Sequence, residues 1–201
     1  MKFRAEIKAI AKERFRNQYG ITVGAGFLIM FLMGCVGWTF IGTLLLVPPL
    51  TVGFAWFNIK VYKGQQADIG DAFTGFGDFG RNIAGMLWMW LFTFLWSLLF
   101  FIPGIVKGIS YSMTPYILAD TKNVSATDAL KLSMRMTQGY KGEIFVMILS
   151  FLGWGILSAM TGGLLWILYV GPYWNASLAG LYQELKANAL AKGVIRPEEL
   201  A

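Results

Sequence analysis

Apolar residues in this chain collect in long runs that are separated by shorter polar stretches. Six such runs cover residues 19–38, 40–59, 83–102, 104–119, 144–160 and 164–182. About 20 residues of α-helix are needed to cross a hydrocarbon layer of about 30 Å. We therefore predict an all-α fold, a polytopic membrane helical bundle with six transmembrane helices arranged as three hairpins. The fourth and fifth runs are short, so we expect thinning of the bilayer or burial within the bundle there.

The overall composition agrees with a membrane protein. Apolar residues make up 56% of the 201 residues and charged residues only 14%. About a quarter of the residues of an average soluble domain are charged, because its surface must be solvated. The apolar runs are also too long for the core helices of a soluble protein.

The basic residues indicate which side of the membrane each connector occupies. In a six-span model, 16 of the 17 Lys and Arg residues lie on one side, and Lys107 is the exception. The positive-inside rule places that side, and both termini, in the cytoplasm. Five or seven spans would scatter the charges over both sides. On the opposite side, the connectors consist of small uncharged residues such as Thr161, Gly162 and Gly163, which predicts tight turns.

The first 18 residues form a separate segment. They carry six basic residues, and Phe3, Ile7, Ile10 and Phe15 recur at roughly helical spacing. This pattern predicts a basic amphipathic helix on the anionic cytoplasmic surface of the membrane. A signal peptide is the alternative, but no convincing small-residue cleavage site follows the apolar stretch. We expect three parts: this interfacial helix (1–18), a six-span transmembrane domain (19–183) and a cytoplasmic tail (184–201).

Three units of the chain share one plan: an amphipathic cytoplasmic segment, a span, a tight turn and a returning span. Asp71 and Asp128 each begin a predicted cytoplasmic helix, where an acid favours the helix dipole. Prolines interrupt the spans, and we expect kinks at Pro49, Pro103, Pro115 and Pro172. Gene duplication would explain this recurrence. The alternative is that amphipathic connectors and kinking prolines are common in membrane bundles.

The chain lacks the residues that several kinds of metal, cofactor and catalytic sites require. The chain has a single cysteine, Cys35, and no histidine, so we predict no disulfide, no metal site and no cofactor. The formal charge of +6 reflects cytoplasmic loops rather than binding to nucleic acid. No phosphate-binding glycine loop, nucleophile elbow or zinc-protease motif is present. We therefore predict no catalytic residues and, on balance, a protein that is not an enzyme.

Lys107 is the clearest candidate for a functional residue, because an ionisable group inside a bilayer is costly. Ser110, Tyr111 and Thr114 follow it at i+3, i+4 and i+7, so the four share one helical face. The functional interpretation is a cavity that opens outward, with Lys107 attracting an anionic headgroup, a carboxylate or a peptide terminus. The alternative is that Lys107 reaches the outer headgroups and the hydroxyls bond to their own helix.

Asn175 is a second candidate, in the sixth predicted span just after Pro172. It could line the same cavity as the residues on the Lys107 face. Hydrogen bonding between helices is the alternative role, typically worth about 0.6 to 2 kcal/mol.

Several stretches resemble a known family. They are 71–79, which starts with Asp71-Ala72-Phe73, 94–107, which contains Phe101-Ile102-Pro103-Gly104, and then Ser110-Tyr111-Ser112-Met113, Tyr116-Ile117-Leu118-Ala119-Asp120, Ser125-Ala126 and Lys131-Leu132-Ser133. Together they resemble a family of small bacterial membrane proteins known as domain of unknown function 975. The similarity runs from the N-terminal helix to about Tyr182. It implies a multi-pass protein of the bacterial cytoplasmic membrane, but it implies no activity.

We consider three functions. The leading hypothesis is a non-enzymatic protein that binds or handles a lipid, peptide or other amphiphile, or that scaffolds a membrane complex. Its partners would be membrane lipids and a further membrane protein. The first alternative is a substrate-capturing subunit of a transporter, and the second is a membrane enzyme that acts on lipid headgroups through cytoplasmic Asp residues.

Overall fold

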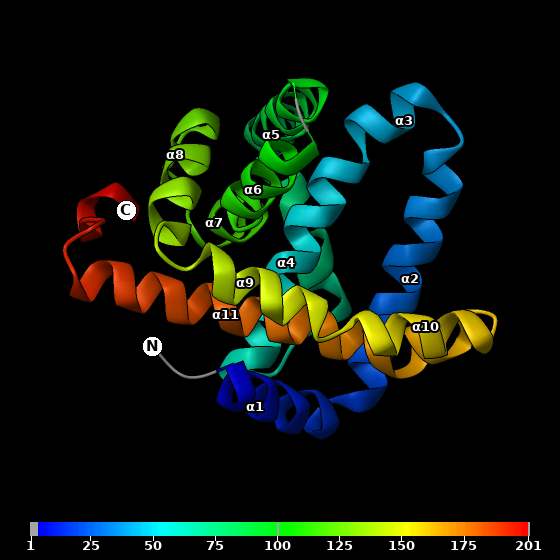
Figure 1. Ribbon diagram of the computed structural model, residues 1–201. Coiled ribbons are helices and arrows are strands. Elements are labelled where there is room, and N and C mark those ends of the chain that lie inside the picture. Colours follow the sequence, from blue (N-terminus) through cyan, green and yellow to red (C-terminus); the bar gives the residue numbers. More distant parts are fainter. Residues whose placement is uncertain (1–3, 100, 201) are drawn as a thin grey trace.

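The computed structural model describes residues 4–99 and 101–200, and every regular element in this part of the chain is helical (Figure 1). The elements are α1 (Arg4–Asn17), α2 (Tyr19–Gly37), α3 (Phe40–Leu45), α4 (Val47–Lys63), η1 (Ile69–Phe76), α5 (Phe79–Leu99), α6 (Phe101–Tyr111), α7 (Thr114–Asp120), α8 (Ala126–Thr137), α9 (Lys141–Leu149), α10 (Leu152–Met160), η2 (Trp166–Val170), α11 (Gly171–Ala191) and η3 (Pro197–Leu200). The predicted all-α class is therefore confirmed.

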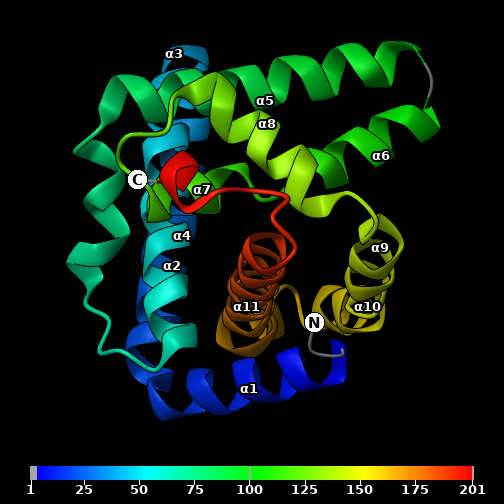
Figure 2. The ribbon, with the colours of Figure 1, turned by 90° about the vertical axis from the view of Figure 1, so that its left-hand side faces the viewer.

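The long helices form three pairs, each with an outgoing and a returning arm. In the first pair α2 returns as α3 and α4, in the second α5 returns as α6 and α7, and in the third α9 and α10 return as η2 and α11. The pairs run in different directions. In Figure 1 the first pair stands upright, the third lies across the view and the second is seen end-on, whereas the second lies across the view in Figure 2. Their turns consequently point away from one another.

Each returning arm is divided into two helical elements, and the second of them has proline in its first turn. Proline occupies the first turn of α4, of α7 and of α11, at Pro48 and Pro49, Pro115 and Pro172. The first turn of a helix tolerates proline, because its N–H has no partner within the helix at that position. Pro103, the remaining predicted kink, lies instead in the first turn of α6, beyond the turn of the second pair.

Two of the connecting helices, η1 and α8, begin in the same way. Asp68 caps η1 and forms a reciprocal capping box with Asp71, while Ser125 caps α8 by accepting the N–H of Asp128. The residues just before these caps, Ala67 and Val124, are buried. A buried residue before a polar cap fixes the angle at which the chain enters the helix. Units of the chain that are far apart in sequence thus share one local design.

The connecting helices close the three pairs into a ring. Helix η1 packs mainly on α4 of the first pair, and α8 packs on α5, α6 and α7 of the second. Helix α1 precedes the first pair but packs mainly on α11 of the third. Its Ile7, Ala11 and Phe15 are completely buried in this contact. The apolar face of α1 is therefore covered by protein, and its charged face remains exposed.

The centre of the molecule is formed by the second halves of the returning arms, α4, α7 and α11. The rings of Tyr116 and Tyr182 stack there with their centroids 5.7 Å apart. Gly180 of α11 lies directly against the ring of Tyr62 on α4, where a Cβ atom would collide with the ring. The absence of a side chain at Gly180 thus sets how closely α4 and α11 approach.

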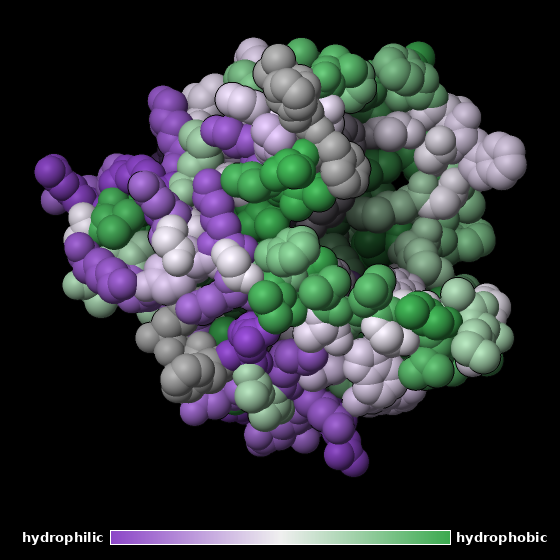
Figure 3. All heavy atoms as spheres, viewed as in Figure 1, coloured by the Kyte–Doolittle hydropathy of each residue, from purple (hydrophilic) through white to green (hydrophobic). Residues whose placement is uncertain are grey.

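Apolar and charged surfaces lie at different ends of the molecule. Large apolar residues at the three turns are strongly exposed, including Trp38 (91%), Ile102 (72%) and Met160 (79%). In Figure 3, hydrophobic residues cover the upper and right-hand parts, and hydrophilic residues gather at the left and below. Exposed apolar surface of this extent marks contact with a membrane or with another protein.

Three helical stretches in the described residues are long and apolar enough to cross a membrane. They are Tyr19–Gly37, Phe40–Lys63 and Lys141–Met160, which correspond to the first, second and fifth predicted runs. The fourth predicted run is divided between α6 and α7, each of which is much shorter than the about 20 residues that a straight span requires. The sixth run passes into α11, which continues beyond residue 183 to Ala191.

Candidate functional site

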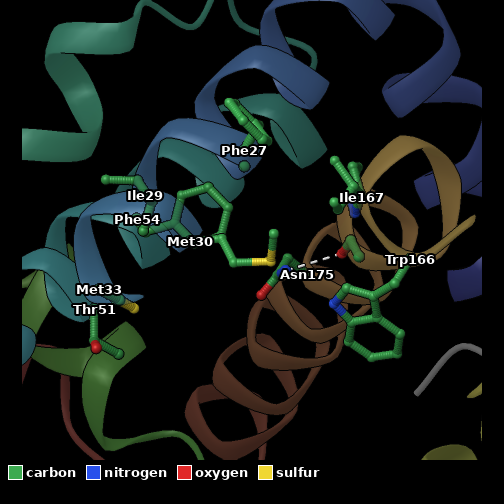
Figure 4. Close-up of a pocket in the computed structure, with 12 residues that line it drawn as sticks. Phe27, Ile29, Met30, Met33, Thr51, Phe54, Trp166, Ile167 and Asn175 are labelled. Carbon is green, nitrogen blue, oxygen red and sulfur yellow. Dashed lines mark hydrogen bonds between the residues drawn. The ribbon is translucent and has the colours of Figure 1, made fainter. Parts of the chain in front are cut away.

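A cavity of about 320 Å³ lies between the first and third helix pairs (Figure 4). We call it the apolar chamber. Its lining residues come from α2, α4, η2 and α11, and they are Gly26, Phe27, Ile29, Met30, Met33, Thr51, Phe54, Trp166, Ile167, Gly171, Pro172 and Asn175. None of these residues is charged. In Figure 4, Met30 and Trp166 flank Asn175, which donates a hydrogen bond of 2.8 Å to the Gly171 carbonyl of its own helix.

A second apolar cavity, of about 580 Å³, lies between the first and second pairs. It shares Thr51 of α4 with the apolar chamber, and it is otherwise lined mainly by α5, α6 and α7. Its hydroxyl groups are already satisfied within their own helices. Thr51 donates to the Val47 carbonyl at 2.8 Å and Thr93 to the Met89 carbonyl at 2.7 Å. Both cavities therefore offer apolar walls with few free polar groups, which suits an alkyl chain better than a polar solute.

The face of α6 that carries Lys107 packs against α5 and α8. The Lys107 ammonium lies 4.8 Å from the ring centroid of Trp96 and 5.9 Å from that of Tyr111, and its Nζ is 3.9 Å from Sδ of Met134. A cation over an aromatic face is stabilised by about 0.5 to 2 kcal/mol. The structure thus surrounds the ammonium with rings and a thioether from three helices.

The hydroxyl groups on this face are largely internal. Ser110 is buried and donates to the Val106 carbonyl at 2.7 Å, and its own carbonyl accepts a hydrogen bond of 2.7 Å from Ser133 of α8. Thr114 is also fully buried, and its Oγ1 has no hydrogen-bond partner among the described residues. Lys107, Ser110 and Tyr111 are therefore brought together at the junction of α6 with α8.

Asn175 lies elsewhere. The chamber that it lines is built from α2, α4, η2 and α11, and no residue of α6 is part of that lining. The structure therefore separates Asn175 from the Lys107 face, and the two do not form one cavity.

A buried ion cluster joins the three returning arms at the charged end of the molecule. The carboxylate of Asp120, at the end of α7, lies 2.5 Å from Nζ of Lys186 on α11 and 3.6 Å from Nζ of Lys63 on α4. The hydroxyl of Tyr182 donates to the same carboxylate at 2.9 Å. The Asp120 side chain is only 7% exposed. Asp120 of the second pair thus links α4 of the first pair to α11 of the third.

This cluster did not emerge from the sequence. Asp120 stood among the acids of the cytoplasmic connectors, with no sign that it would be buried. A usable signal was present, because Lys63, Asp120 and Lys186 each lie just after the C-terminal end of a returning apolar run. Charges of opposite sign at one depth of a bundle are candidates for pairing.

A polar cavity of about 500 Å³ adjoins this cluster, between η1, α4, α5 and α7. Arg81 of α5 crosses it and holds the end of α7, donating to the carbonyls of Leu118 at 2.8 Å, Thr121 at 2.7 Å and Val124 at 3.2 Å. An arginine in this position satisfies carbonyls that a helix end leaves without partners. The Asp78 carboxylate lies 3.3 Å from Nη2 of the same arginine.

Lys8 anchors α1 to the third pair. Its Nζ lies 4.2 Å from the ring centroid of Phe151 and 3.0 Å from Oγ of Ser150, at the break between α9 and α10. Partial burial, together with repulsion from Arg4, lowers the pKa of Lys8 below its ordinary value of 10.5. Lys8 and Lys107 thus both pack against aromatic rings, each where a connecting helix meets a helix pair.

Comparison with known proteins identifies a family. Residues 101–189 match the model of a family described as protein of unknown function (DUF975). The match confirms the resemblance, although it starts later than expected and leaves out the stretch that begins at Asp71. It extends from α6 through most of α11. No curated protein and no solved structure matches this chain.

Proposed function

We propose that this chain, a member of the DUF975 family over residues 101–189, is a non-enzymatic membrane protein that holds an amphiphile between its three helix pairs. The observation that carries this proposal is the pair of uncharged cavities that both have Thr51 in their lining. An alkyl chain is their best ligand, because it asks for no hydrogen bonds and leaves no buried polar group unpaired.

The proposal includes a membrane arrangement with six spans, and both termini in the cytoplasm of a bacterial cell. Two observations support it. The exposed apolar residues at the three turns lie away from the charged end that contains α1, η1 and α8. In addition, residues 20–59, 82–106 and 144–183 contain no charged residue, so each helix pair presents at least 25 uncharged residues in succession. Because the pairs diverge, their helices would be strongly tilted in the bilayer.

Two alternatives stay predictions: a substrate-capturing transporter subunit and an enzyme that acts on lipid headgroups. In the enzyme alternative, Asp71 and Asp128 are the candidate catalytic acids. Asp71 is bound to Lys60 at 2.7 Å and belongs to the capping box of η1, and Asp128 is bound to Lys131 at 2.9 Å and accepts a hydrogen bond from the Ser125 cap of α8. These structural roles favour the non-enzymatic proposal.

Two glycines of α2 provide a matched test. Gly26 lines the apolar chamber, and a Cβ atom there would have room, with its nearest neighbours 3.9 and 4.0 Å away. Gly24 lies on the same helix with nothing within 4 Å of its Cβ position. We expect Gly26→Leu to fill the chamber and to reduce co-purifying amphiphile by about tenfold, the equivalent of about 1.4 kcal/mol. Gly24→Leu should leave it unchanged.

Native mass spectrometry of protein released from its own membranes measures this directly. The adduct masses on the wild type identify the amphiphile, and their occupancy is compared between the two variants. Melting temperatures establish that both variants are folded. Equal adduct occupancy in Gly26→Leu and Gly24→Leu, or a wild type without adducts, would contradict the proposal.

A further inference from the structure

The polar cavity beside Asp120 contains a buried hydrogen-bond acceptor that nothing in the described residues satisfies. Asn82 of α5 lines this cavity and is only 2% exposed. Its Nδ2 donates to the Gly75 carbonyl at 2.6 Å, whereas its Oδ1 has no donor among the described residues. A buried acceptor without a donor is destabilising, and a ligand with N–H or O–H groups would satisfy it.

The charged groups around the cavity differ in how many hydrogen bonds and ion pairs they already make within the protein. Both Nη atoms of Arg81 are engaged by carbonyls at the end of α7, whereas its Nε is buried without an acceptor among the described residues. The Asp78 carboxylate is 49% exposed and has one contact, 3.3 Å from Arg81. The groups still available around the cavity are therefore the buried acceptor Asn82, the half-exposed acceptor Asp78 and the Nε donor of Arg81. Acceptors of this kind bind a hydrogen-bond donor that carries positive charge.

Two further residues restrict the ligand. Trp56 of α4 lines the cavity and offers an aromatic ring, which also attracts cations. Lys122 lines it as well, is exposed, and is suited to an anion at the mouth. A ligand with an ammonium group next to a phosphate would satisfy both ends.

From this geometry we propose that the polar cavity binds a primary ammonium group, supplied by the headgroup of an aminophospholipid such as phosphatidylethanolamine. Asp78 and Asn82 accept from the ammonium, and Lys122 meets the adjacent phosphate. The lipid source of the ammonium rests on the proposed function.

The neighbouring apolar cavity favours a lipid over a soluble amine. Thr51, Met86 and Pro115 line that apolar cavity. Val52, Asn82 and Leu118 line the polar cavity, at most about one helical turn away on the same three helices. The two cavities therefore follow one another along α4, α5 and α7, as the headgroup and the chain of one amphiphile would.

Short-chain lipids separate headgroup binding from chain binding. The full-length protein in detergent is titrated with dihexanoyl phosphatidylethanolamine, phosphatidylcholine or phosphatidylglycerol, and with free ethanolamine, and adducts are counted by native mass spectrometry. We expect phosphatidylethanolamine to bind about tenfold more tightly than the other two lipids. Asp78→Asn should remove this preference, whereas the surface variant Asp128→Asn should keep it.

Asn82→Asp supplies a second variant of nearly equal size. An added carboxylate should retain or strengthen phosphatidylethanolamine binding, while a purely structural asparagine would lose it. Free ethanolamine that binds as tightly as the lipid, with the same dependence on Asp78, would support the ammonium site and identify a soluble amine as its source. Equal binding of all three lipids, or a preference for phosphatidylglycerol, would overturn the proposal.

The short-chain lipid experiment tests the ammonium site independently of the Gly26→Leu experiment on the apolar chamber. Gly26 does not line the polar cavity, so Gly26→Leu should leave binding of the short-chain lipid intact. Loss of long-chain adducts in Gly26→Leu with no headgroup preference in the wild type would support the proposed function and reject the ammonium site alone.

Discussion

Asp120 holds the three returning arms together through a contact that depends on its charge. Its carboxylate is shared by Lys186, Lys63 and Tyr182, and it is nearly buried. Removing one member of a buried ion cluster is costly, because the remaining charges stay buried without compensation. The two lysines are themselves partly exposed, which limits that cost.

Asp120→Asn is therefore expected to lower the free energy of unfolding by about 3 kcal/mol. The double variant Asp120→Asn/Lys186→Gln should recover part of this loss, because it removes one of the uncompensated cations. Chemical denaturation of the purified protein in detergent measures both values. Asp128→Asn, at an exposed ion pair, should have little effect. Similar losses in Asp120→Asn and Asp128→Asn would show that the central cluster has no special role.

At the scale of elements, the structure reuses one kind of ion pair, between an acid on a short helix and a basic residue on a neighbouring helix. Asp71 of η1 binds Lys60 of α4, and Glu199 of η3 binds Arg135 of α8 at 2.6 Å. In both cases the acid lies three residues after the residue that precedes the short helix. Asp71 follows Asp68 in this way, and Glu199 follows Arg196. The C-terminal segment thus docks on the molecule with the same local design as an internal connector.

This docking is expected to depend on pH. Hydrogen bonds from Arg135 and from the Arg196 N–H lower the pKa of Glu199 below its ordinary value of 4.5. A lowered carboxylate pKa stabilises the folded contact above the ordinary pKa, and this contribution is lost as the pH falls through the folded value. The tail should therefore stay docked at pH 7 and separate from α8 in acid, below pH 4.5.

A dye attached at Glu198→Cys, in a Cys35→Ser background, reports this step by fluorescence anisotropy. Glu199→Gln should give low anisotropy throughout, because its side chain cannot be ionised. An acid transition that is the same with and without Glu199→Gln would assign the change to another group.

At the scale of the whole molecule, three helix pairs diverge from a charged base and are closed into a ring by α1. Because α1 precedes the first pair and covers the third, the ring cannot be completed until both ends of the chain are present. The same arrangement keeps the apolar turns apart and leaves cavities between the pairs.

Thiol labelling in a Cys35→Ser background tests how this molecule lies in a membrane. Trp38→Cys, Leu98→Cys and Met160→Cys, each at or near a different turn, should react with a membrane-impermeant maleimide in intact cells. Lys12→Cys on α1 should react only after the membrane is permeabilised. Labelling of any turn that requires permeabilisation would remove that pair from the six-span arrangement.

The sequence by itself determined the helical class, the apolar runs, the separation of charge and the family resemblance. These properties follow from local composition and periodicity, which a single chain displays directly. Proline at residues 49, 115 and 172 lies in the first turn of α4, α7 and α11, where its missing N–H is tolerated.

Only the tertiary structure decided which faces meet. The Lys107 face predicted an outward cavity, but it packs on α8, while Asn175 lines a chamber with α2. Asp120 was one acid among several until Lys63 and Lys186 were brought beside it. The Asp120 pairings join residues that are more than 50 positions apart, and helical periodicity carries no information about the partner of a face. The pairing is decided by the packing of small residues such as Gly180 against Tyr62 and by the closure of the ring through α1.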